Sequence, residues 1–544
     1  MLKKSPTSAL PKRLMSEFNK NALAILEKRY LLRDRSGKIV ETPDQLFQRV
    51  AKNVAASLKE QKQFYQLLSQ LEFLPNTPTL MNAGTAIGQL SACFVIPVED
   101  SLEGIFTAVK NMALIQQSGG GTGFSFSRLR PKGDTVKTTH GVASGPVSFM
   151  RIFDETTEVI KQGGKRRGAN MGILSVNHPD IIEFITLKRE SDVLHNFNIS
   201  VAATNVFMEA VKTNTPFDLV NPRTKKRINS VSARGVFDLM VDSAWRTGDP
   251  GIIFIDEINR RHSLRALGKI EATNPCGEQP LLPFESCNLG SINLLKMKKE
   301  GSLDWDKLRE TIRMAVTFLD NIIDKNKYPI TETEKITLAN RKIGLGIMGF
   351  ADMLIKLGVR YDSDKALELG ESLARFIEKE GHARSQELGK EKGSFPNFKK
   401  SHWYKKGYRY LRNATVTTIA PTGTISIIAG CSSGIEPIFS LDFTKEVLGG
   451  TRLSTHYEKT DATVGSFEIA TEWHVRMQAV FQKYCDNAVS KTINLPEKAT
   501  TEEIRQAFLM AYELKCKGLT VYRYGSKPKQ VLYTEDTGEP CCEV

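Results

Sequence analysis

Apolar and polar positions repeat with two different periods along the chain, and these periods predict its elements. From Leu46 to Val54 the apolar residues recur at helical spacing. Residues 42–45 (Thr-Pro-Asp-Gln) precede them with a Thr cap, Pro at the first helical position and Gln at the third. We therefore expect a helix that starts after Thr42, within an N-terminal helical region over residues 1–70.

The rest of the chain alternates short apolar runs with amphipathic segments. Runs at Asn198–Val201, Ile252–Ile255 and Val416–Ile419 predict buried strands, and Val236–Trp245 and Leu308–Ile323 predict helices. Such alternation is typical of an α/β body with parallel strands. We assign this body to residues 71–527 and interpret the polar residues 528–544 as a flexible tail.

Composition and charge limit the class of protein. The chain has 544 residues, of which 40% are hydrophobic and 25% charged, the balance of a soluble globular protein. Its net charge of +14 favours anionic partners without choosing among them. The basic N-terminus lacks the apolar run of a secretory signal, and the most apolar stretch, residues 414–430, is too short and polar to span a membrane. We expect a cytoplasmic protein with no membrane partner.

The densest basic segment, residues 390–412, is interleaved with aromatic residues. Aromatic and basic residues together can bind nucleic acid. The simpler interpretation is an insertion whose aromatic side chains pack on the body, and we therefore expect no nucleic-acid partner.

Eight scattered cysteines contain no C-x-x-C pair, so we expect no structural metal site. Pro275 and Gly277 flank Cys276, which predicts a tight loop presenting one thiol. A loop cysteine is more often structural than catalytic, and no histidine base lies near it in sequence. From these residues alone, both roles stay open.

Two further segments favour turns that approach a ligand. Residues 118–124 are rich in glycine, which suits either phosphate binding or close packing of a strand and a helix. Residues 420–426 (Ala-Pro-Thr-Gly-Thr-Ile-Ser) follow an apolar strand, and a hydroxyl-rich turn that opens a helix can hold phosphate.

Taken in order, the motifs resemble those of the catalytic chain of the ribonucleotide reductases. Their individual amino-acid sequences resemble those of the adenosylcobalamin-dependent class II branch. The matching motifs are Pro-Thr-Leu-Met-Asn-Ala-Gly (78–84), Leu-Ser-Ala-Cys-Phe (90–94), Gly-Gly-Gly-Thr-Gly (119–123), Asn-Pro-Cys-Gly-Glu (274–278), Ser-Cys-Asn-Leu-Gly-Ser-Ile-Asn-Leu (286–294), Arg-Lys-Ile-Gly-Leu-Gly-Ile-Met-Gly-Phe (341–350), Ala-Pro-Thr-Gly-Thr-Ile-Ser (420–426) and Thr-Val-Tyr-Arg-Tyr-Gly-Ser (520–526). The likeness covers residues 20 to 532.

The resemblance implies a fold and a reaction. The fold is a ten-stranded α/β barrel, made of two five-stranded parallel halves, around a finger loop. Cys276 at the loop tip matches the thiyl-radical cysteine, Glu278 the base that takes the proton of the 3′ hydroxyl, and Asn274 the amide that binds the ribose. Cys93 and Cys287 match the pair that reduces the sugar and ends as a disulfide.

The resemblance also implies binding residues. Substrate contacts match Thr77, Ala92, Gly121, Pro421, Thr422, Gly423, Thr424, Ile425 and Ser426, the last six as a phosphate loop. The positions that hold a dNTP or ATP effector match Asp100, Ser101, Leu102, Arg130 and Lys137. Lys165, Arg166, Arg167 and Asn170 match the loop that carries effector identity to the substrate, although an ordinary basic surface turn would look similar. An effector site of this kind implies a homodimer.

Adenosylcobalamin is the radical source that the resemblance favours. The branch that uses a separate metal subunit carries two adjacent tyrosines, whereas Arg523 follows Tyr522 here. Vicinal Cys541 and Cys542 stand where relatives carry two spaced tail thiols, so either this pair or a thioredoxin-like protein acts as reductant. Diphosphates are the expected substrates. The alternatives are a catalytic subunit that needs a metal partner and an inactive nucleotide-binding regulator.

Overall fold

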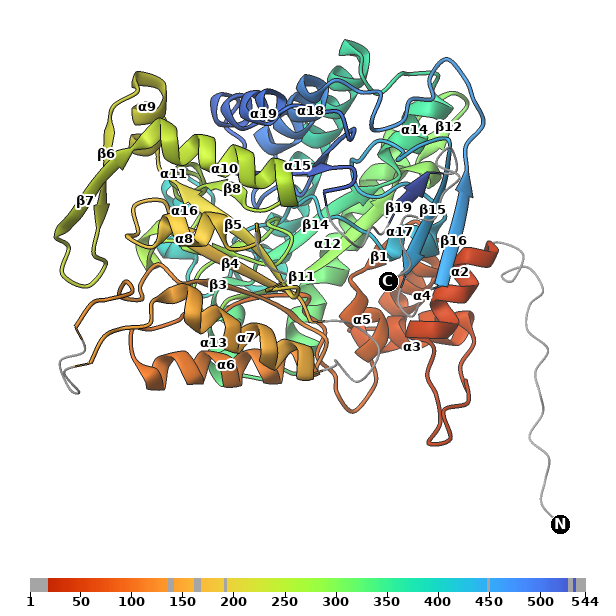
Figure 1. The fold of residues 1–544 in the computed structure, drawn as a ribbon. Helices are drawn as coiled ribbons and strands as arrows, with labels where there is room; N and C mark the ends of the chain where they lie inside the picture. Colours follow the sequence, from red (N-terminus) through yellow and green to blue (C-terminus); the bar gives the residue numbers. More distant parts are fainter. Residues whose placement is uncertain are drawn as a thin grey trace.

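The computed structural model describes residues 18–135, 141–160, 168–189, 193–447, 451–526 and 532–534. Six residues singled out above lie outside these ranges, namely Lys137, Lys165, Arg166, Arg167, Cys541 and Cys542. Figure 1 shows a central sheet surrounded by helices, with the N-terminal helices in red near the blue β15–β16 hairpin. No helix within the described ranges is long and apolar enough to cross a membrane.

The N-terminal helices confirm the predicted cap. Helix α3 (Pro43–Val54) begins after Thr42, whose side chain accepts the backbone N–H of Gln45. The Gln45 side chain in turn accepts the backbone N–H of Thr42, so two N–H groups at the helix start are satisfied. The other elements here are α2 (Lys20–Ile25), the π-helix η1 (Leu26–Tyr30), α4 (Leu58–Ser69), β1 (Phe73–Pro75) and α5 (Thr77–Asn82).

Five strands form one parallel half of the sheet, in the order β2-β3-β4-β5-β8. The strands are β2 (Cys93–Val95), β3 (Gly121–Ser125), β4 (Asn170–Ser175), β5 (Phe197–Ala203) and β8 (Gly251–Phe254). The connecting elements are α6 (Leu102–Gln117), α7 (Pro146–Val159), α8 (Ile181–Thr186), α9 (Asn205–Thr213), the hairpin β6 (Pro216–Val220) and β7 (Arg227–Ser232), and α10 (Ala233–Thr247). The predicted strands at 198 and 252 and the helix at 236–245 are confirmed.

β1 pairs antiparallel with β11 (Ser286–Asn293) at one edge of the sheet, and the four other strands run opposite to the parallel half. They are β11, β14 (Ile343–Met348), β17 (Thr492–Leu495) and β18 (Gly518–Arg523). β11 lies parallel to β14, and β17 lies parallel to β18. Antiparallel pairs join the two groups at β2–β11 and at β8–β18, so the sheet has two seams.

The predicted strand at 416–419 forms only isolated bridges. Leu345 of β14 bridges Thr417 in parallel, and Ile419 bridges Val489 in parallel, just before β17. Backbone bonds accompany them, from Leu345 N to Val416 O at 2.7 Å and from Ser490 N to Ile419 O at 2.9 Å. The segment is therefore extended and hydrogen-bonded on both sides.

Helices cover the outside of the sheet. α12 (Trp305–Lys325), which confirms the helix predicted at 308–323, packs against β11 and β14 and along α15 (Asp364–Lys392). The remaining elements are α11 (Ile255–Arg260), η2 (Arg265–Leu267), β9 (Ala272–Thr273), β10 (Pro280–Leu281), η3 (Leu294–Lys296), β12 (Lys298–Lys299), β13 (Ser302–Leu303), α13 (Thr331–Asn340), α14 (Phe350–Lys356), η4 (Phe398–Lys400), α16 (His402–Lys405), α17 (Ile425–Ala429), α18 (Thr471–Lys483) and α19 (Thr501–Glu513).

A small sheet changes the interpretation of the tail. Strands β15 (Asp442–Val447) and β16 (Thr451–His456) form an antiparallel hairpin, and β19 (Leu532–Thr534) pairs with β15. β19 falls inside residues 528–544, so three residues of the predicted tail pair with β15, and the rest of the tail lies outside the described residues. The backbone of β19 is therefore held to the hairpin.

The basic segment at 390–412 packs only in part as expected for an insertion, because Tyr404 and Tyr410 are 50% and 48% exposed. Phe395, Phe398 and Trp403 are buried in one cluster with Leu264 and Leu411. Their aromatic faces are therefore used for packing and are not exposed for stacking on bases.

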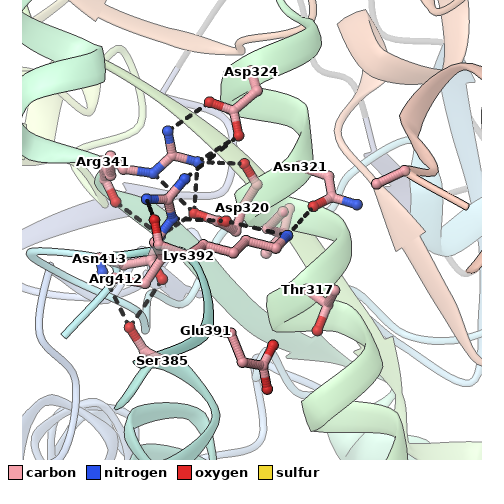
Figure 2. A network of polar contacts seen from close by, with 12 residues as sticks. Thr317, Asp320, Asn321, Asp324, Arg341, Ser385, Glu391, Lys392, Arg412 and Asn413 are labelled. Carbon is pink, nitrogen blue, oxygen red and sulfur yellow. Dashed lines mark hydrogen bonds and ion pairs between the residues drawn. The ribbon is translucent and has the colours of Figure 1, made fainter. Parts of the chain in front are cut away.

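A buried ionic network fixes the outer helices to the strands (Figure 2). Asp320 of α12 is fully buried and accepts from Arg341 Nη2 at 2.8 Å, from Arg412 Nε at 3.2 Å and from Asn413 Nδ2 at 3.0 Å. Arg341 also bonds Asp324 one turn further along α12. Since Arg341 and Asn413 directly precede β14 and the 415–419 segment, one carboxylate positions two neighbouring strands of the sheet.

We expect Asp320→Asn to destabilise the protein by about 3–5 kcal/mol, because it leaves buried arginines without their main counter-charge. The midpoint of chemical denaturation measures this loss. Asp324→Asn is the matched control, since the Asp324 side chain is 46% exposed and its removal should cost about 1 kcal/mol or less. Equal losses for the two variants would contradict the assignment.

Candidate active site

The loop that carries Cys276 is a tight turn between β9 and β10, as the sequence predicted. Two hydrogen bonds between Asn274 and Gln279 close the loop. The backbone N–H of Asn274 donates to Gln279 O at 3.1 Å, and its Oδ1 accepts from Gln279 N at 2.9 Å. Gly277 has a φ of +80°, a conformation that glycine adopts without strain. We call residues 272–281 the finger.

Glycines make room for the finger against the sheet. A Cβ on Gly123 of β3 would lie 1.7 Å from Thr273 O, and a Cβ on Gly121 would lie 2.9 Å from Pro275 Cγ. On the other group of strands, a Cβ on Gly344 would lie 2.6 Å from Gln279 Nε2. The run at 118–124 thus ends in strand β3, and its glycines serve close packing as well as the site.

Backbone carbonyls of the finger are held by residues that the sequence analysis did not identify. Asn198 Nδ2 donates to Pro275 O at 2.8 Å. Thr418 Oγ1 and Ala488 N both donate to Glu278 O at 2.9 Å. The one available signal was a polar residue, Asn198, at the start of the otherwise apolar run at 198–201, and this residue is exposed in β5.

Two cavities meet at Cys276. One, of about 290 Å³, is lined by Cys93, Asn274, Cys276 and Glu278 together with residues 420–425. The other, of about 420 Å³, is lined by Cys276, by residues 488–492 and by Tyr522 of β18. Cys276 is exposed, whereas Asn274 and Glu278 are each 2% exposed. One thiol therefore borders two separate spaces.

Cys93 and Cys287 face each other across the β2–β11 seam. They are register partners of an antiparallel pair, and both are buried free thiols. Such partners have Cα atoms about 4.5–5.5 Å apart, within the range of about 4.4–6.8 Å that a disulfide accepts. Asn274 Nδ2 donates to Cys93 Sγ at 3.0 Å, which connects this pair to the finger.

The environment keeps both of these thiols protonated. Burial raises the pKa of Cys93 well above its ordinary value, and the nearby Glu278 carboxylate raises it further. Burial likewise raises the pKa of Cys287, although Lys342 opposes the shift. At neutral pH the pair carries its hydrogen atoms.

The conformation of the turn at 420–426 is fixed by a hydrogen bond to a neighbouring segment. Thr422 has a φ of +55°, and its Oγ1 accepts from Gly434 N at 2.7 Å. Helix α17 follows directly, as the sequence predicted. Two contacts reach this wall from the N-terminal helices, from Arg29 Nη1 to Thr424 Oγ1 at 3.2 Å and between Tyr30 and Thr77 hydroxyls at 2.8 Å.

The smaller cavity gathers most of the predicted substrate contacts. Its lining includes Thr77, Ala92, Gly121 and all of Pro421 to Ile425. Ser426 is buried outside this lining and borders a third cavity of about 370 Å³. Cys287 does not line the smaller cavity, so it acts on that space only through its neighbour Cys93.

The predicted effector residues lie at the start of α6, apart from this site. Ser101 caps α6, and its hydroxyl accepts Gly104 N at 3.0 Å. Arg130 Nε is 3.0 Å from Asp100 Oδ2, and Leu102 is 65% exposed. The structure thus groups four of the five residues, while Lys137 lies outside the described ranges.

Asn170 differs from the loop residue that the resemblance implied. It begins strand β4, is fully buried and exchanges hydrogen bonds with Gln116, Thr122 and Thr157. A buried amide in a satisfied network fixes packing, so we correct its side-chain role to a structural one. The three basic residues of that loop lie outside the described residues.

Family models match nearly the whole chain. The model described as the ribonucleotide reductase all-alpha domain matches residues 16–88, and the barrel-domain model matches residues 91–461 and 455–522.

Individual relatives agree with these matches. A protein of Thermoplasma acidophilum named vitamin B12-dependent ribonucleoside-diphosphate reductase is 49% identical, covering 96% of this chain and 81% of its own length. A Mycobacterium tuberculosis protein of the same name is 46% identical over 94% of this chain and 80% of its own. A ribonucleoside-diphosphate reductase subunit alpha of Chlamydia pneumoniae is 28% identical over 90% and 57%. With its thiol-tipped finger inside a mixed sheet, the chain belongs to the ribonucleotide reductase family.

Proposed function

We propose that this chain reduces ribonucleoside diphosphates to 2′-deoxyribonucleotides through a thiyl radical on Cys276. The observation that supports this proposal most directly is the cavity of about 290 Å³. It is lined by Cys276, Glu278, Asn274 and Cys93 together with the turn at 420–425. The names of the relatives from Thermoplasma and Mycobacterium support both the reaction and the diphosphate substrate.

Each residue of the site has a distinct part in this proposal. The Cys276 sulfur takes the 3′ hydrogen atom of the ribose and returns it after reduction. Glu278, buried beside Cys93, accepts the proton of the 3′ hydroxyl as general base. Asn274 binds a ribose hydroxyl, and its orientation is set by Gln279 N and Cys93. The small, buried cavity limits the access of water to the radical.

The Cys93–Cys287 pair supplies the electrons. As the 2′ hydroxyl leaves as water, the two thiols release two hydrogen atoms in total and become one disulfide, which balances the reduction. Raised thiol pKa values suit this part, because the donors must carry their hydrogens. A thioredoxin-like protein or the tail thiols Cys541 and Cys542 would then reduce the disulfide by exchange. None of the six described cysteines forms a disulfide, which fits a cytoplasmic setting.

We propose adenosylcobalamin as the source of the radical. The second cavity, of about 420 Å³, borders the other side of Cys276 and offers polar groups from Ser490, Thr492 and Asn494. These residues and the backbone at 488–492 would hold the cofactor's adenosyl end, and the bound cofactor supplies the one-electron oxidation of Cys276. The relatives' names support this choice. Because Arg523 follows Tyr522, no second phenol adjoins Tyr522 in sequence. The Arg523 guanidinium lies over the Trp245 ring, 4.1 Å from its centroid.

We also propose that the sheet closes into a ten-stranded barrel. The 415–419 segment bridges β14 on one side and Val489 on the other, and Val489 runs into β17. With this segment counted, the strands fall into two parallel groups of five, β2-β3-β4-β5-β8 and β11-β14-(415–419)-β17-β18. The antiparallel seams at β2–β11 and β8–β18 then complete the ring.

A homodimer with a dNTP or ATP effector near α6 completes the proposal. Leu102, Phe106 and Leu114 of α6 are exposed, and Val159 at the end of α7 is 74% exposed. Large apolar side chains exposed together on neighbouring helices favour association with another copy. Asp100, Ser101 and Arg130 lie at the same end of α6, so an effector there would border the interface.

The direct test is an anaerobic assay of the full chain with adenosylcobalamin, dithiothreitol and CDP. We expect dCDP to accumulate, and dCTP to form more slowly when CTP replaces CDP. Absence of dCDP with the cofactor, or its formation without cobalamin, would overturn the proposal.

Two cysteine variants separate radical formation from reduction. Cys276→Ser should lower dCDP formation by at least about 10³-fold and abolish substrate 3′ hydrogen exchange. Cys287→Ser should also stop dCDP formation but retain 3′ hydrogen exchange, because its part comes later. Cys516→Ser, at a buried thiol that lines neither cavity, is the control. Loss of hydrogen exchange in Cys287→Ser would show that the order of steps is wrong.

Phe106→Glu tests the dimer. A charge in the centre of the apolar face should weaken association at least about 100-fold, measured by sedimentation. Val206→Glu is the control, because Val206 is 70% exposed on α9, away from that face. An unchanged dimer in Phe106→Glu would place the interface elsewhere.

A further inference from the structure

The proposed substrate cavity contains little charge to receive a diphosphate. Among the described residues that line it, Glu278 is the one Asp, Glu, Lys or Arg, and it is an acid. The turn at 421–425 offers hydroxyls and backbone groups but no cation. A strongly anionic ligand buried here requires positive charge from the rim of the cavity.

One cation reaches this turn from the β15–β16 hairpin. Lys445 Nζ donates to Gly423 O at 3.0 Å. Lys445 also lines the cavity of about 370 Å³, which shares Pro421 and Gly423 with the substrate cavity. Among the described residues no ion pair to its ammonium group is found, and burial alone lowers the pKa of Lys445. A partly dehydrated ammonium without an acid gains from an anionic ligand.

A second cation reaches the same turn from the opposite end of the chain. Arg29 Nη1 donates to Thr424 Oγ1 at 3.2 Å, the residue next to Gly423. Arg29 belongs to the π-helix η1, a rare conformation that is frequent at functional sites. The adjacent Tyr30 bonds Thr77, which lines the substrate cavity as well. The π-helix thus presents two consecutive residues to one wall of the site.

We propose that Arg29 and Lys445 together bind the terminal phosphate of the ribonucleoside diphosphate at the 421–426 turn. The assignment rests on the proposed function and deepens it by naming what distinguishes a diphosphate from a monophosphate. Both side chains already touch the turn, so each reaches a phosphate held there by exchanging one oxygen acceptor for another. The Arg29 guanidinium can give two parallel hydrogen bonds, and the Lys445 ammonium acts as a point charge.

The arrangement also joins three parts of the molecule through one ligand. Arg29 comes from the N-terminal helices, Lys445 from the hairpin and the turn from the sheet. A phosphate bound by all three links them, so substrate occupancy fixes the position of the hairpin relative to the sheet. The β19 strand that pairs with β15 is held by the same link.

Equilibrium binding of CDP and CMP to the full-length protein, measured by calorimetry without cofactor, tests the assignment. Lys445→Met and Arg29→Met should each weaken CDP binding about 10- to 100-fold and CMP binding by less than about threefold, because CMP lacks the terminal phosphate. Lys445→Arg should restore most of the CDP affinity. Lys28→Met and Lys459→Met, at exposed neighbouring lysines, are the matched controls. In turnover, KM for CDP should rise more than kcat falls.

Equal losses for CDP and CMP would show that the two residues only hold the turn in place, and unchanged affinities would show that they do not contact substrate. Either result overturns the inference. If the wild-type protein does not reduce CDP but the contrast between CDP and CMP appears, the proposed reaction fails and the phosphate site stands. If it reduces CDP without that contrast, only the phosphate site fails. Should Lys445→Met not fold, the Arg29→Met and Lys445→Arg pair decides the outcome.

Discussion

The close passage of the finger along the sheet is the constraint on which the site depends. Thr273 O occupies the space in which any side chain on Gly123 would have to lie, and Gln279 does the same at Gly344. The finger can therefore lie at this depth only where two strands have no side chain. Its carbonyls then find donors in Asn198, Thr418 and Ala488, so the tip is fixed from several strands. Cys276 gains a defined position between two spaces without a rigid helix beneath it.

The charged residues of the site and those around it lie in different parts of the molecule. The interior of the site contains one buried acid and two thiols that stay protonated, so hydrogen atoms and a single proton are what it can exchange. Permanent positive charge lies on the N-terminal helices and the hairpin, outside the reacting volume. A separate ionic network around Asp320 stabilises the packing of α12 against the strands (Figure 2).

Local patterns predicted much of this structure. The Thr42 cap, the helix at 308–323 and the strands at 198 and 252 follow from short-range periodicity and chain stiffness, which act through neighbouring residues. The segment at 416–419 was predicted as a strand, but its bridges depend on partners at 345 and 489 that no local pattern identifies. Arg29 and Lys445 were missed for the same reason, because their meeting at one turn is a product of tertiary contacts across most of the chain. Asn170 was assigned to a loop by its position in a motif, whereas its burial is decided by Gln116 and Thr157.

The seam between β2 and β11 has a mechanical consequence. All the chain between Cys93 and Cys287 lies within the loop that a disulfide there would close, and that loop contains β3, β4, β5, β8 and the finger itself. A cross-link spanning so long a loop restricts the unfolded chain strongly, by an amount on the order of 5 kcal/mol in the chain-entropy model. The oxidised protein would then be the form that is more stable against unfolding, and the reduced protein that is ready to react would be the less stable one. Each catalytic cycle would raise the free energy of unfolding, and each encounter with a reductant would lower it again.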